Sequence, residues 1–351
     1  MRTLAEFEAA ARERLDPVHF DFFAGGARDE LTLRANETAF RRLSLLPKVL
    51  RGNSKRELGI ELLGTPTSMP IVLSPTAFHR LAHPEGERAT ARAAARVGAI
   101  MIVSMGATTT VEDIAAAAPG GSTRWFQLYL QPDPRVTEAL VRRAERAGMA
   151  ALVVTVDSPV FGGRERDDRN GFHDLPSGVV AENLRELPGG EPGRAADIAM
   201  SAEFTWEHLA WLRGITSLPL LLKGVLHPED ARLAVGAGVA GLVVSNHGGR
   251  QLDTAAATID ALPEIAEAVG GAIPLILDGG IRRGTDVVKA LALGATAVGV
   301  GRPVLWGLAA AGEDGVTRVL ELLREEFDLA MALCGAASPS ELTPDLVRTY
   351  S

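Results

Sequence analysis

The stretch G-L-V-V-S-N-H, at residues 241–247, is an apolar run that ends abruptly in polar side chains. Seven other stretches of the chain repeat this pattern. Near-continuous apolar runs of this length are typical of parallel strands that are buried on both faces. The eight predicted strands are P-I-V-L-S-P-T-A (70–77), A-I-M-I-V-S-M (99–105), R-W-F-Q-L-Y-L (124–130), A-L-V-V-T-V-D (151–157), L-P-L-L-L-K-G-V (218–225), G-L-V-V-S-N-H (241–247), I-P-L-I-L-D-G-G (273–280) and A-V-G-V-G-R-P (297–303).

Helical patterns lie between most of these runs, for example over residues 84–96, 134–148 and 228–238. A proline near the start and a glycine near the end are typical of helix boundaries. Strands that alternate with helices eight times predict an α/β fold of the (β/α)8 TIM-barrel type. A doubly wound parallel sheet is the alternative.

The whole chain of 351 residues is predicted to form one domain, in which two segments stand outside the alternation. Residues 1–69 are expected to be an N-terminal helical extension that packs against a barrel of residues 70–330, and residues 331–351 a C-terminal tail. Residues 158–204 are rich in Gly, Pro and charge and are too long for an ordinary connection. Loops of this kind are often active-site lids, so we expect a mobile lid over one face of the barrel.

Composition excludes several classes of function. A net charge of −8 argues against a nucleic-acid-binding surface. No run approaches the ~18 apolar residues of a membrane span, and the N-terminus lacks the apolar run of a signal peptide. Cys334 is the single cysteine and cannot form an internal disulfide, which favours a reducing compartment. We therefore expect a cytoplasmic protein without membrane or nucleic-acid partners.

Polar residues follow every one of the eight predicted strands, and in such a barrel the carboxyl ends of the strands meet at one face. Lys223 ends an otherwise apolar strand, where a buried ammonium is costly unless it faces an anion or forms a Schiff base. His247 and Arg250 flank two glycines, so a base and a cation would lie together at the end of their strand. The pattern favours a catalytic face over a purely structural barrel.

Glycines and arginines cluster after the last two strands, in D-G-G-I-R-R-G-T-D (278–286) and G-V-G-R-P (299–303). Free backbone N–H groups beside a guanidinium form a phosphate cradle, and barrels often bind phosphate at this position. The alternative is two glycine turns with solvated arginines. No metal site is predicted, because Pro84 separates the spaced pair His79 and His83 from the following helix.

Several of these motifs together make the sequence similar to the FMN-dependent 2-hydroxy acid oxidase/dehydrogenase family. The resemblance rests on S-N-H-G-G-R-Q-L-D (245–253), L-D-G-G-I-R-R-G-T-D (277–286), T-V-D-S-P (155–159) and W-F-Q-L-Y-L (125–130). It runs from about D-F-F-A-G-G-A (21–27) to the last barrel helix. It implies that FMN is the cofactor and that a 2-hydroxy acid is oxidised to the 2-oxo acid.

The resemblance also implies roles for individual residues. His247 would be the base, Asp157 would steady its imidazolium, Arg250 and Arg164 would bind the substrate carboxylate, and Tyr129 would hydrogen-bond the substrate. Lys223 would stabilise negative charge on the reduced flavin. The implied FMN contacts are Pro75, Thr76, Ala77, Ser104, Gln127, Thr155, Lys223 and Ser245 for the flavin and its chain, and Asp278, Gly279, Gly280, Arg282, Gly301 and Arg302 for the phosphate end. The sequence leaves open whether His247 removes the C2 proton or the hydroxyl proton.

Two departures from other family members bear on the substrate. Many members carry Tyr-Tyr where this chain has Phe22-Phe23, and some carry Trp where it has Gly106. Both changes resemble members that act on aromatic acids, so we expect an (S)-2-hydroxy acid of the mandelate type. The alternative is that Phe78, Met105 or residues near Phe161 and Phe172 refill the space beside Gly106.

Three kinds of function remain open at this stage. The first is an oxidase that passes electrons to O2 and releases hydrogen peroxide, which we favour. The second is a dehydrogenase that uses another electron acceptor. The third is a different protein on the same barrel: a modifier of a peptide- or carrier-bound substrate, an FMN-dependent isomerase, or a non-catalytic binding protein. The family resemblance also implies a homotetramer or a larger homo-oligomer.

Overall fold

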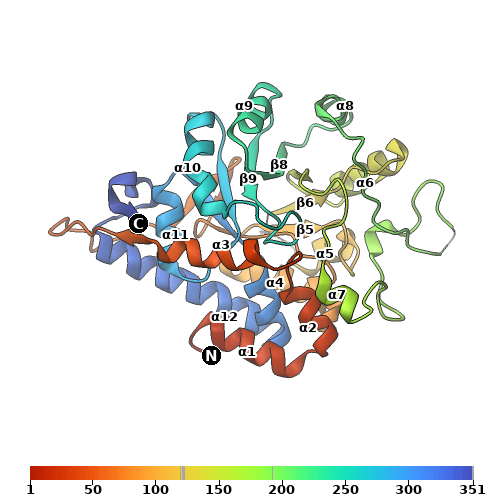
Figure 1. Cartoon of the computed structure of the whole chain (residues 1–351), viewed down its shortest axis with the longest axis horizontal. Helices are drawn as coiled ribbons and strands as arrows, with labels where there is room; N and C mark the ends of the chain where they lie inside the picture. Colours follow the sequence, from red (N-terminus) through yellow and green to blue (C-terminus); the bar gives the residue numbers. More distant parts are fainter. Residues whose placement is uncertain (119, 121–122, 192, 350–351) are drawn as a thin grey trace.

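A closed barrel of eight parallel strands lies at the centre of the computed structural model, which describes residues 1–118, 120, 123–191 and 193–349 (Figure 1). Neighbouring strands follow one another in chain order, and the last pairs with the first. The predicted TIM barrel is confirmed. Its strands are β4 (Ile71–Leu73), β5 (Met101–Ser104), β6 (Arg124–Leu128), β7 (Leu152–Thr155), β8 (Leu220–Val225), β9 (Gly241–Ser245), β10 (Leu275–Asp278) and β11 (Ala297–Val300).

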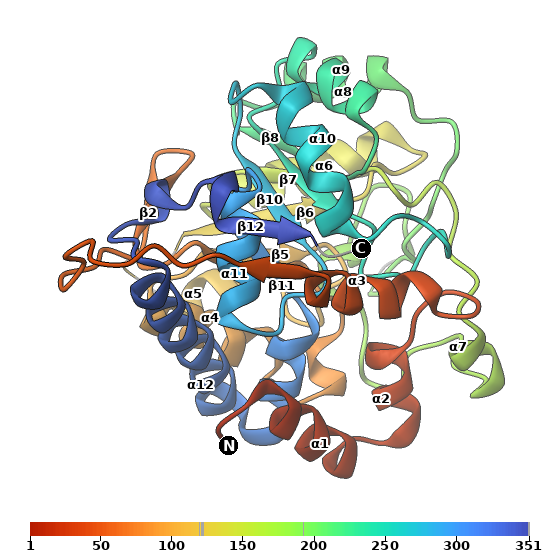
Figure 2. The same ribbon diagram turned by 60° about the vertical axis from the view of Figure 1, so that its left-hand side comes forward.

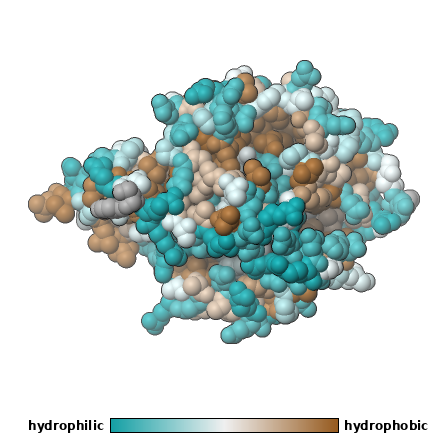
Figure 3. Space-filling view, in the orientation of Figure 1, coloured by the Kyte–Doolittle hydropathy of each residue, from teal (hydrophilic) through white to brown (hydrophobic). Residues whose placement is uncertain are grey.

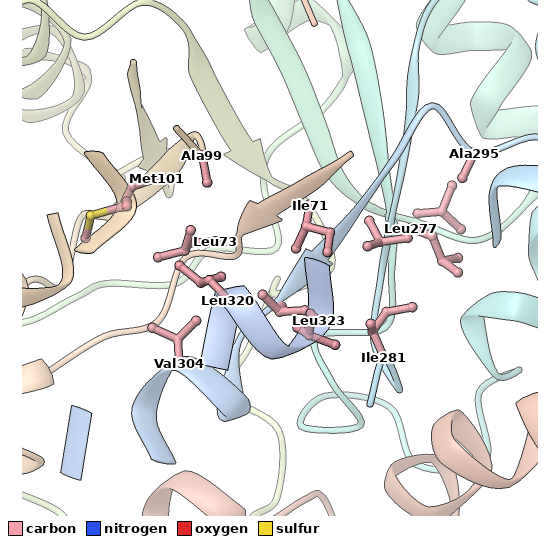
Figure 4. Close-up of a cluster of buried hydrophobic side chains, with 14 of the residues drawn as sticks. Ile71, Leu73, Ala99, Met101, Leu277, Ile281, Ala295, Val304, Leu320 and Leu323 are labelled. Atoms are coloured by element: carbon pink, nitrogen blue, oxygen red, sulfur yellow. The ribbon is translucent and has the colours of Figure 1, made fainter. Parts of the chain in front are cut away.

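The strands are buried on both faces, which explains why their sequences read as continuous apolar runs. One face fills the barrel, where residues such as Trp125, Leu221 and Ile276 form a separate apolar cluster. The other face packs against the surrounding helices. Figure 4 shows Ile71 of β4 beside Leu323, which belongs to the last helix, in the larger of the two clusters.

Helices follow the strands and form the outer ring of the barrel (Figure 1). The last helix is the longest, and it breaks at Ala311 and Gly312, where the backbone leaves helical geometry. The helices of the ring are α4 (Gly86–Val97), α5 (Val111–Ala117), α6 (Pro134–Arg146), α8 (Trp206–Ile215), α9 (Pro228–Gly236), α10 (Thr258–Val269), α11 (Gly284–Ala292) and α12 (Arg302–Cys334). No helix among the described residues is long and apolar enough to cross a membrane.

The first 69 residues contain the predicted helices, but the extension is not wholly helical. Its helices are α1 (Leu4–Arg14), α2 (Pro17–Ala24) and α3 (Leu31–Arg41), and its strands are β1 (Leu43–Leu45), β2 (Ile60–Leu62) and β3 (Thr65–Thr67). β2 and β3 form a hairpin because its two turn residues adopt positive φ, as a tight two-residue turn requires.

The predicted C-terminal tail, residues 331–351, starts within α12, and residues 350 and 351 lie outside the described part of the chain. Its strand β12 (Val347–Thr349) pairs antiparallel with β1, so the C-terminal strand lies beside the N-terminal extension (Figure 2). The loop between β1 and β2 projects at the left of Figure 1, and hydrophobic side chains are exposed there (Figure 3). Among them, Val49 and Leu50 are exposed.

The long segment 158–204, whose residue 192 is outside the described residues, carries the short helices α7 (Glu165–Arg169) and η2 (Glu182–Leu184). It is attached to the barrel at several points. Asn183 is fully buried and its Oδ1 accepts a hydrogen bond from the Val111 backbone N–H at 2.8 Å. The segment therefore forms a wall of the cavity described below, and its mobility stays a prediction.

Candidate active site

A cavity of about 910 Å³ opens at the carboxyl ends of the strands. This volume is near the upper end of the ~300–1,000 Å³ that ligand pockets span, so it can hold a cofactor together with a substrate. The structure brings most of the predicted site residues to its walls. They are Phe22, Pro75, Thr76, Ala77, Ser104, Gln127, Tyr129, Thr155, Arg164, Lys223, His247, Arg250, Asp278, Gly279, Gly280, Arg282, Gly301 and Arg302.

His247 and Asp157 form a hydrogen-bonded pair at this face, with 2.9 Å between His247 Nδ1 and Asp157 Oδ1. Ser158 Oγ lies 3.0 Å from the same carboxylate oxygen. Burial raises the pKa of Asp157, but the charges and hydrogen bonds of His247, Lys223 and Ser158 outweigh this effect and lower it below its ordinary value. Asp157 is thus an anion that orients the imidazole.

The imidazole of His247 is suited to accept a proton. Burial lowers the pKa of His247, the carboxylate of Asp157 opposes this, and the charge of Lys223 reinforces it, so the net shift is downward. The ring is therefore neutral at neutral pH. Because Nδ1 faces Asp157, Nε2 is left toward the cavity, 3.4 Å from the Tyr129 hydroxyl. Burial and the charge of Asp157 raise the pKa of Tyr129, which keeps its proton as a hydrogen-bond donor.

Lys223 belongs to a buried polar network at the cavity floor. Its Nζ donates to Ser245 Oγ at 3.1 Å and lies 3.4 Å from Asp278 Oδ2. The hydroxyls of Ser245 and Ser74 both donate to Asp278, at 2.7 and 2.6 Å. Ser245 is fully buried behind the wall and does not line the cavity. Charge pairing explains how an ammonium is tolerated at the end of an apolar strand.

Gln127 connects three neighbouring strand ends. Its Nε2 donates to Thr155 Oγ1 at 3.0 Å, and its Oε1 accepts from Ser104 Oγ at 3.3 Å. Ser104 pairs with Gln127 in the register of β5 and β6, so the contact follows from strand alignment. The result is a row of polar groups across one wall of the cavity.

The predicted phosphate cradle combines glycine turns with two arginines. Gly279 and Gly280 adopt φ of +120° and +83°, and Arg302 is the first residue of α12. Within the described residues Arg302 donates to backbone carbonyls, at 2.8–3.0 Å. Burial and the charge of Arg282 lower the pKa of Arg302 to about 10. A cation held this way, at a helix N-terminus, favours an anionic ligand.

Arg250 and Arg164 both lie near the ring of Phe22. The guanidinium carbon of Arg250 is 5.1 Å from the centre of the Phe22 ring, and that of Arg164 is 5.8 Å from it. Arg250 Nη1 also donates to the carbonyl oxygens of Phe22 and Gly25, at 2.7 and 3.0 Å. Burial and the charge of Arg164 lower the pKa of Arg250 well below its ordinary value. Two confined like charges are arranged to bind a carboxylate.

Aromatic rings line the cavity next to these arginines. The Phe22 ring lies 5.1 Å from Phe172 and 5.8 Å from Phe78, measured between ring centres. Gly106, however, is buried and does not line the cavity. A Cβ there would lie 3.0 Å from Cδ1 of Ile198, so the space predicted beside Gly106 is partly filled by the segment after β7. Sequence alone could not place Ile198 there because the contact spans a long loop.

Ser74, Ser158 and Gln251 are among the residues of the site that were missed in the sequence. Ser74 and Ser158 support Asp278 and Asp157, as described above. Gln251 holds the start of the long segment, because its Oε1 accepts from the Gly162 N–H at 2.9 Å and its Nε2 donates to the carbonyl of Asp157 at 3.1 Å. All three stand inside or beside the predicted motifs, but serine and glutamine are too common in loops to be singled out by type.

The comparisons with known proteins agree with this geometry. The family model for FMN-dependent dehydrogenase matches residues 11–349. Glycolate oxidase 1 of Zea mays is 49% identical over 354 aligned positions, and the alignment covers 99% of this chain and 95% of that protein. A peroxisomal (S)-2-hydroxyacid oxidase of Arabidopsis thaliana is 47% identical over 348 residues, 98% of this chain and 95% of its own length.

Solved structures resemble this chain to a comparable degree. A mandelate oxidase with benzoylformic acid is 46% identical, has a TM-score of 0.91 and covers 100% of this chain and 98% of its own. A mandelate oxidase with (S)-2-phenylpropionate gives the same values.

Proposed function

The chain belongs to the FMN-dependent dehydrogenase family and is an FMN-dependent (S)-2-hydroxy acid oxidase, and from this premise we propose that its substrate is an aromatic acid of the mandelate type. The relatives are named for glycolate, for mandelate and for 2-hydroxy acids in general. The choice among these substrates therefore depends on the walls of the cavity.

One observation carries the proposal: Phe22 lies beside both arginines and is also the centre of the aromatic wall. A 2-hydroxy acid whose carboxylate meets Arg164 and Arg250 would place its C2 substituent against Phe22, Phe78 and Phe172. A phenyl ring there would gain ~0.5–1.5 kcal/mol from aromatic contacts beyond the burial of its area. The hydrogen or methyl substituent of glycolate or lactate would leave this wall without a partner.

The residues present fit FMN. Lys223 is 4% exposed, and a buried ammonium at the cavity floor suits the polar edge of a flavin that gains negative charge. Arg302 and Arg282, next to the glycine turns, suit a phosphate. Ser104, Gln127 and Thr155 offer hydroxyl and amide groups along the wall between them. Bound FMN would supply the two-electron redox chemistry that links the substrate to O2.

The chain's own residues supply the rest of the chemistry. We assign to Arg250 and Arg164 the binding of the carboxylate, and to Tyr129 a hydrogen bond to the substrate. His247 Nε2 accepts a proton from the bound acid, and Asp157 holds the imidazolium that forms. The substrate loses two electrons and two protons and becomes the 2-oxo acid, and O2 becomes hydrogen peroxide.

The proposal includes an electron acceptor, an oligomeric state and a cellular compartment. Oxygen is the proposed electron acceptor because the relatives are named as oxidases. A homotetramer or larger assembly is expected, and the exposed Val49 and Leu50 offer an apolar surface that a second copy could cover. The cytoplasm stays the expected compartment.

The test is a comparison of kcat/KM for (S)-mandelate, (S)-lactate and glycolate, with peroxide measured in each assay. We expect mandelate to exceed the two small acids by at least about tenfold. Equal or higher values for glycolate would refute the aromatic proposal, and the filled space at Gly106 would then explain a small pocket.

A variant pair sharpens this test. Phe22→Leu should lower kcat/KM for mandelate about threefold to tenfold, and that for glycolate much less, because the aromatic contact is lost. Phe204 does not line the cavity and its ring lies 5.2 Å from that of His208, so Phe204→Leu is the matched control and should change neither value appreciably.

A further inference from the structure

The arginines of the proposed carboxylate clamp face a carboxylate of the chain itself. Asp167 Oδ2 lies 3.5 Å from Arg164 Nη1, and Asp167 lines the same cavity. The side chains of Asp167 and Arg164 are 13% and 19% exposed, so water screens their charges only in part. Burial raises the pKa of Asp167 above its ordinary value, and the charges of Arg164 and Arg250 oppose this shift.

The helix that carries Asp167 is fixed from outside the cavity. Arg166, the preceding residue of α7, lies 3.2 Å from Asp21 Oδ1 and 2.7 Å from Glu30 Oε2. Asn170 Nδ2 donates to the other oxygen of Asp21 at 3.0 Å. These contacts tie α7 to the N-terminal segment, so Asp167 is held in place beside Arg164.

We propose that Asp167 is an internal counter-ion of the carboxylate clamp, which competes with the substrate carboxylate for Arg164 and thereby weakens the binding of acids. The inference rests on the proposed function, because it takes a 2-hydroxy acid as the ligand of Arg164 and Arg250. In the absence of ligand the carboxylate offsets the repulsion between the two guanidinium groups. With a ligand bound, a second carboxylate must share the same cations.

The arrangement has a consequence for turnover. The product is a 2-oxo acid and carries the same carboxylate as the substrate, so a clamp without a counter-ion would retain it. A competing internal carboxylate raises the dissociation constants of substrate and product together. Asp167 thus favours product release at the cost of substrate affinity.

The opposite role for Asp167 predicts the opposite result. If Asp167 served to position Arg164 for the substrate, its removal would weaken the binding of acids. The sign of the change in affinity therefore separates a competitor from a positioning residue.

The experiment measures KM for the 2-hydroxy acid that the wild-type protein oxidises best, and Kd for the corresponding 2-oxo acid from the change in flavin absorbance. Asp167→Asn should lower both constants about threefold to tenfold, the range expected for a partly buried charge. Glu165→Gln is the matched control, because it removes a negative charge from the same helix, and Glu165 does not line the cavity. The control should leave both constants within about twofold.

A neutral ligand isolates the charge effect. The amide 2-hydroxy-2-phenylacetamide lacks the carboxylate, so its Kd should not fall in Asp167→Asn. Asp167→Ala provides a second removal of the charge, and flavin content shows whether each variant is folded.

Unchanged or raised constants for the acids in both Asp167 variants would overturn the inference, as would an equal fall for the neutral amide. A wild-type protein that oxidises no 2-hydroxy acid would instead refute the proposed function. The two failures are therefore distinguishable.

Discussion

At the scale of single residues, the site depends on one imidazole whose two nitrogens face different partners. His247 Nδ1 lies 2.9 Å from Asp157, and Nε2 is turned toward the cavity. His247→Asn should therefore keep FMN bound, because the phosphate end is intact, yet slow flavin reduction about 10²- to 10⁴-fold. Anaerobic stopped-flow bleaching of the flavin measures this rate. Reduction at the wild-type rate would exclude His247 as the base.

Gly224, on the neighbouring strand β8, leaves room for the Asp157 side chain that pairs with His247. Its φ is +107°, and an added Cβ would lie 2.5 Å from the Cβ and Cγ atoms of Asp157. Gly224→Ala should therefore displace Asp157 and slow flavin reduction at least about 100-fold, because small misplacements of catalytic groups are costly.

Gly214→Ala is the control for this change. Gly214 lies in α8, where the added methyl group enters open space and alanine favours the helix by about 1 kcal/mol. The control should keep full activity. A fully active Gly224→Ala enzyme would show that the strand end can move aside without disturbing Asp157.

At the scale of elements, the hairpin β2–β3 contributes stability rather than chemistry. Leu62 of β2 is completely buried and joins the apolar cluster inside the barrel, with Ile100 and Trp125. Leu62→Ala should therefore lower the free energy of unfolding by about 2–5 kcal/mol, the usual cost of such a cavity, and leave KM unchanged. Urea denaturation measures the first and steady-state kinetics the second.

A leucine outside the hairpin provides the control for Leu62→Ala, because the side chain of Leu252 is 73% exposed. Leu252→Ala should change the free energy of unfolding by no more than about 0.5 kcal/mol. If Leu62→Ala behaved in the same way, the hairpin would not be part of the barrel core.

The elements also differ in how well their sequences predict them. Strands such as 241–247 were predicted within about two residues, because burial on both faces leaves a continuous apolar run. The sequence does not predict β1 and β12. Each has only three residues, and they pair with each other across almost the whole length of the chain, so neither leaves a local pattern. The helix predicted over residues 228–238 is α9, which ends at Gly236, two residues before the predicted end.

At the scale of the whole molecule, the barrel and the long segment 158–204 enclose His247, and this burial sets the pH dependence of kcat/KM. Burial lowers the pKa of His247 from its ordinary value of 6.5, against the opposing charge of Asp157. The base must be neutral, and its neutral fraction rises with pH. We therefore expect kcat/KM to be constant above about pH 7 and to fall only below about pH 6.5.

A pH series of kcat/KM tests this, since that ratio reports the free enzyme. An acidic limb centred above pH 7 would show that Asp157 outweighs burial. Tyr129, whose pKa is raised by burial and by Asp157, should add no alkaline limb below pH 10.

The sequence by itself determined the barrel and the chemical types at its mouth. Eight apolar runs that alternate with helices favour a barrel over a doubly wound sheet, and the motif around His247 and Arg250 is local, so both predictions follow from the order of residues. Only the tertiary structure decided which groups meet: Asp167 with Arg164, Ser74 with Asp278, and Ile198 with Gly106. These contacts join different loops and strand ends, and a loop's path depends on packing and charge across the whole molecule rather than on its own pattern.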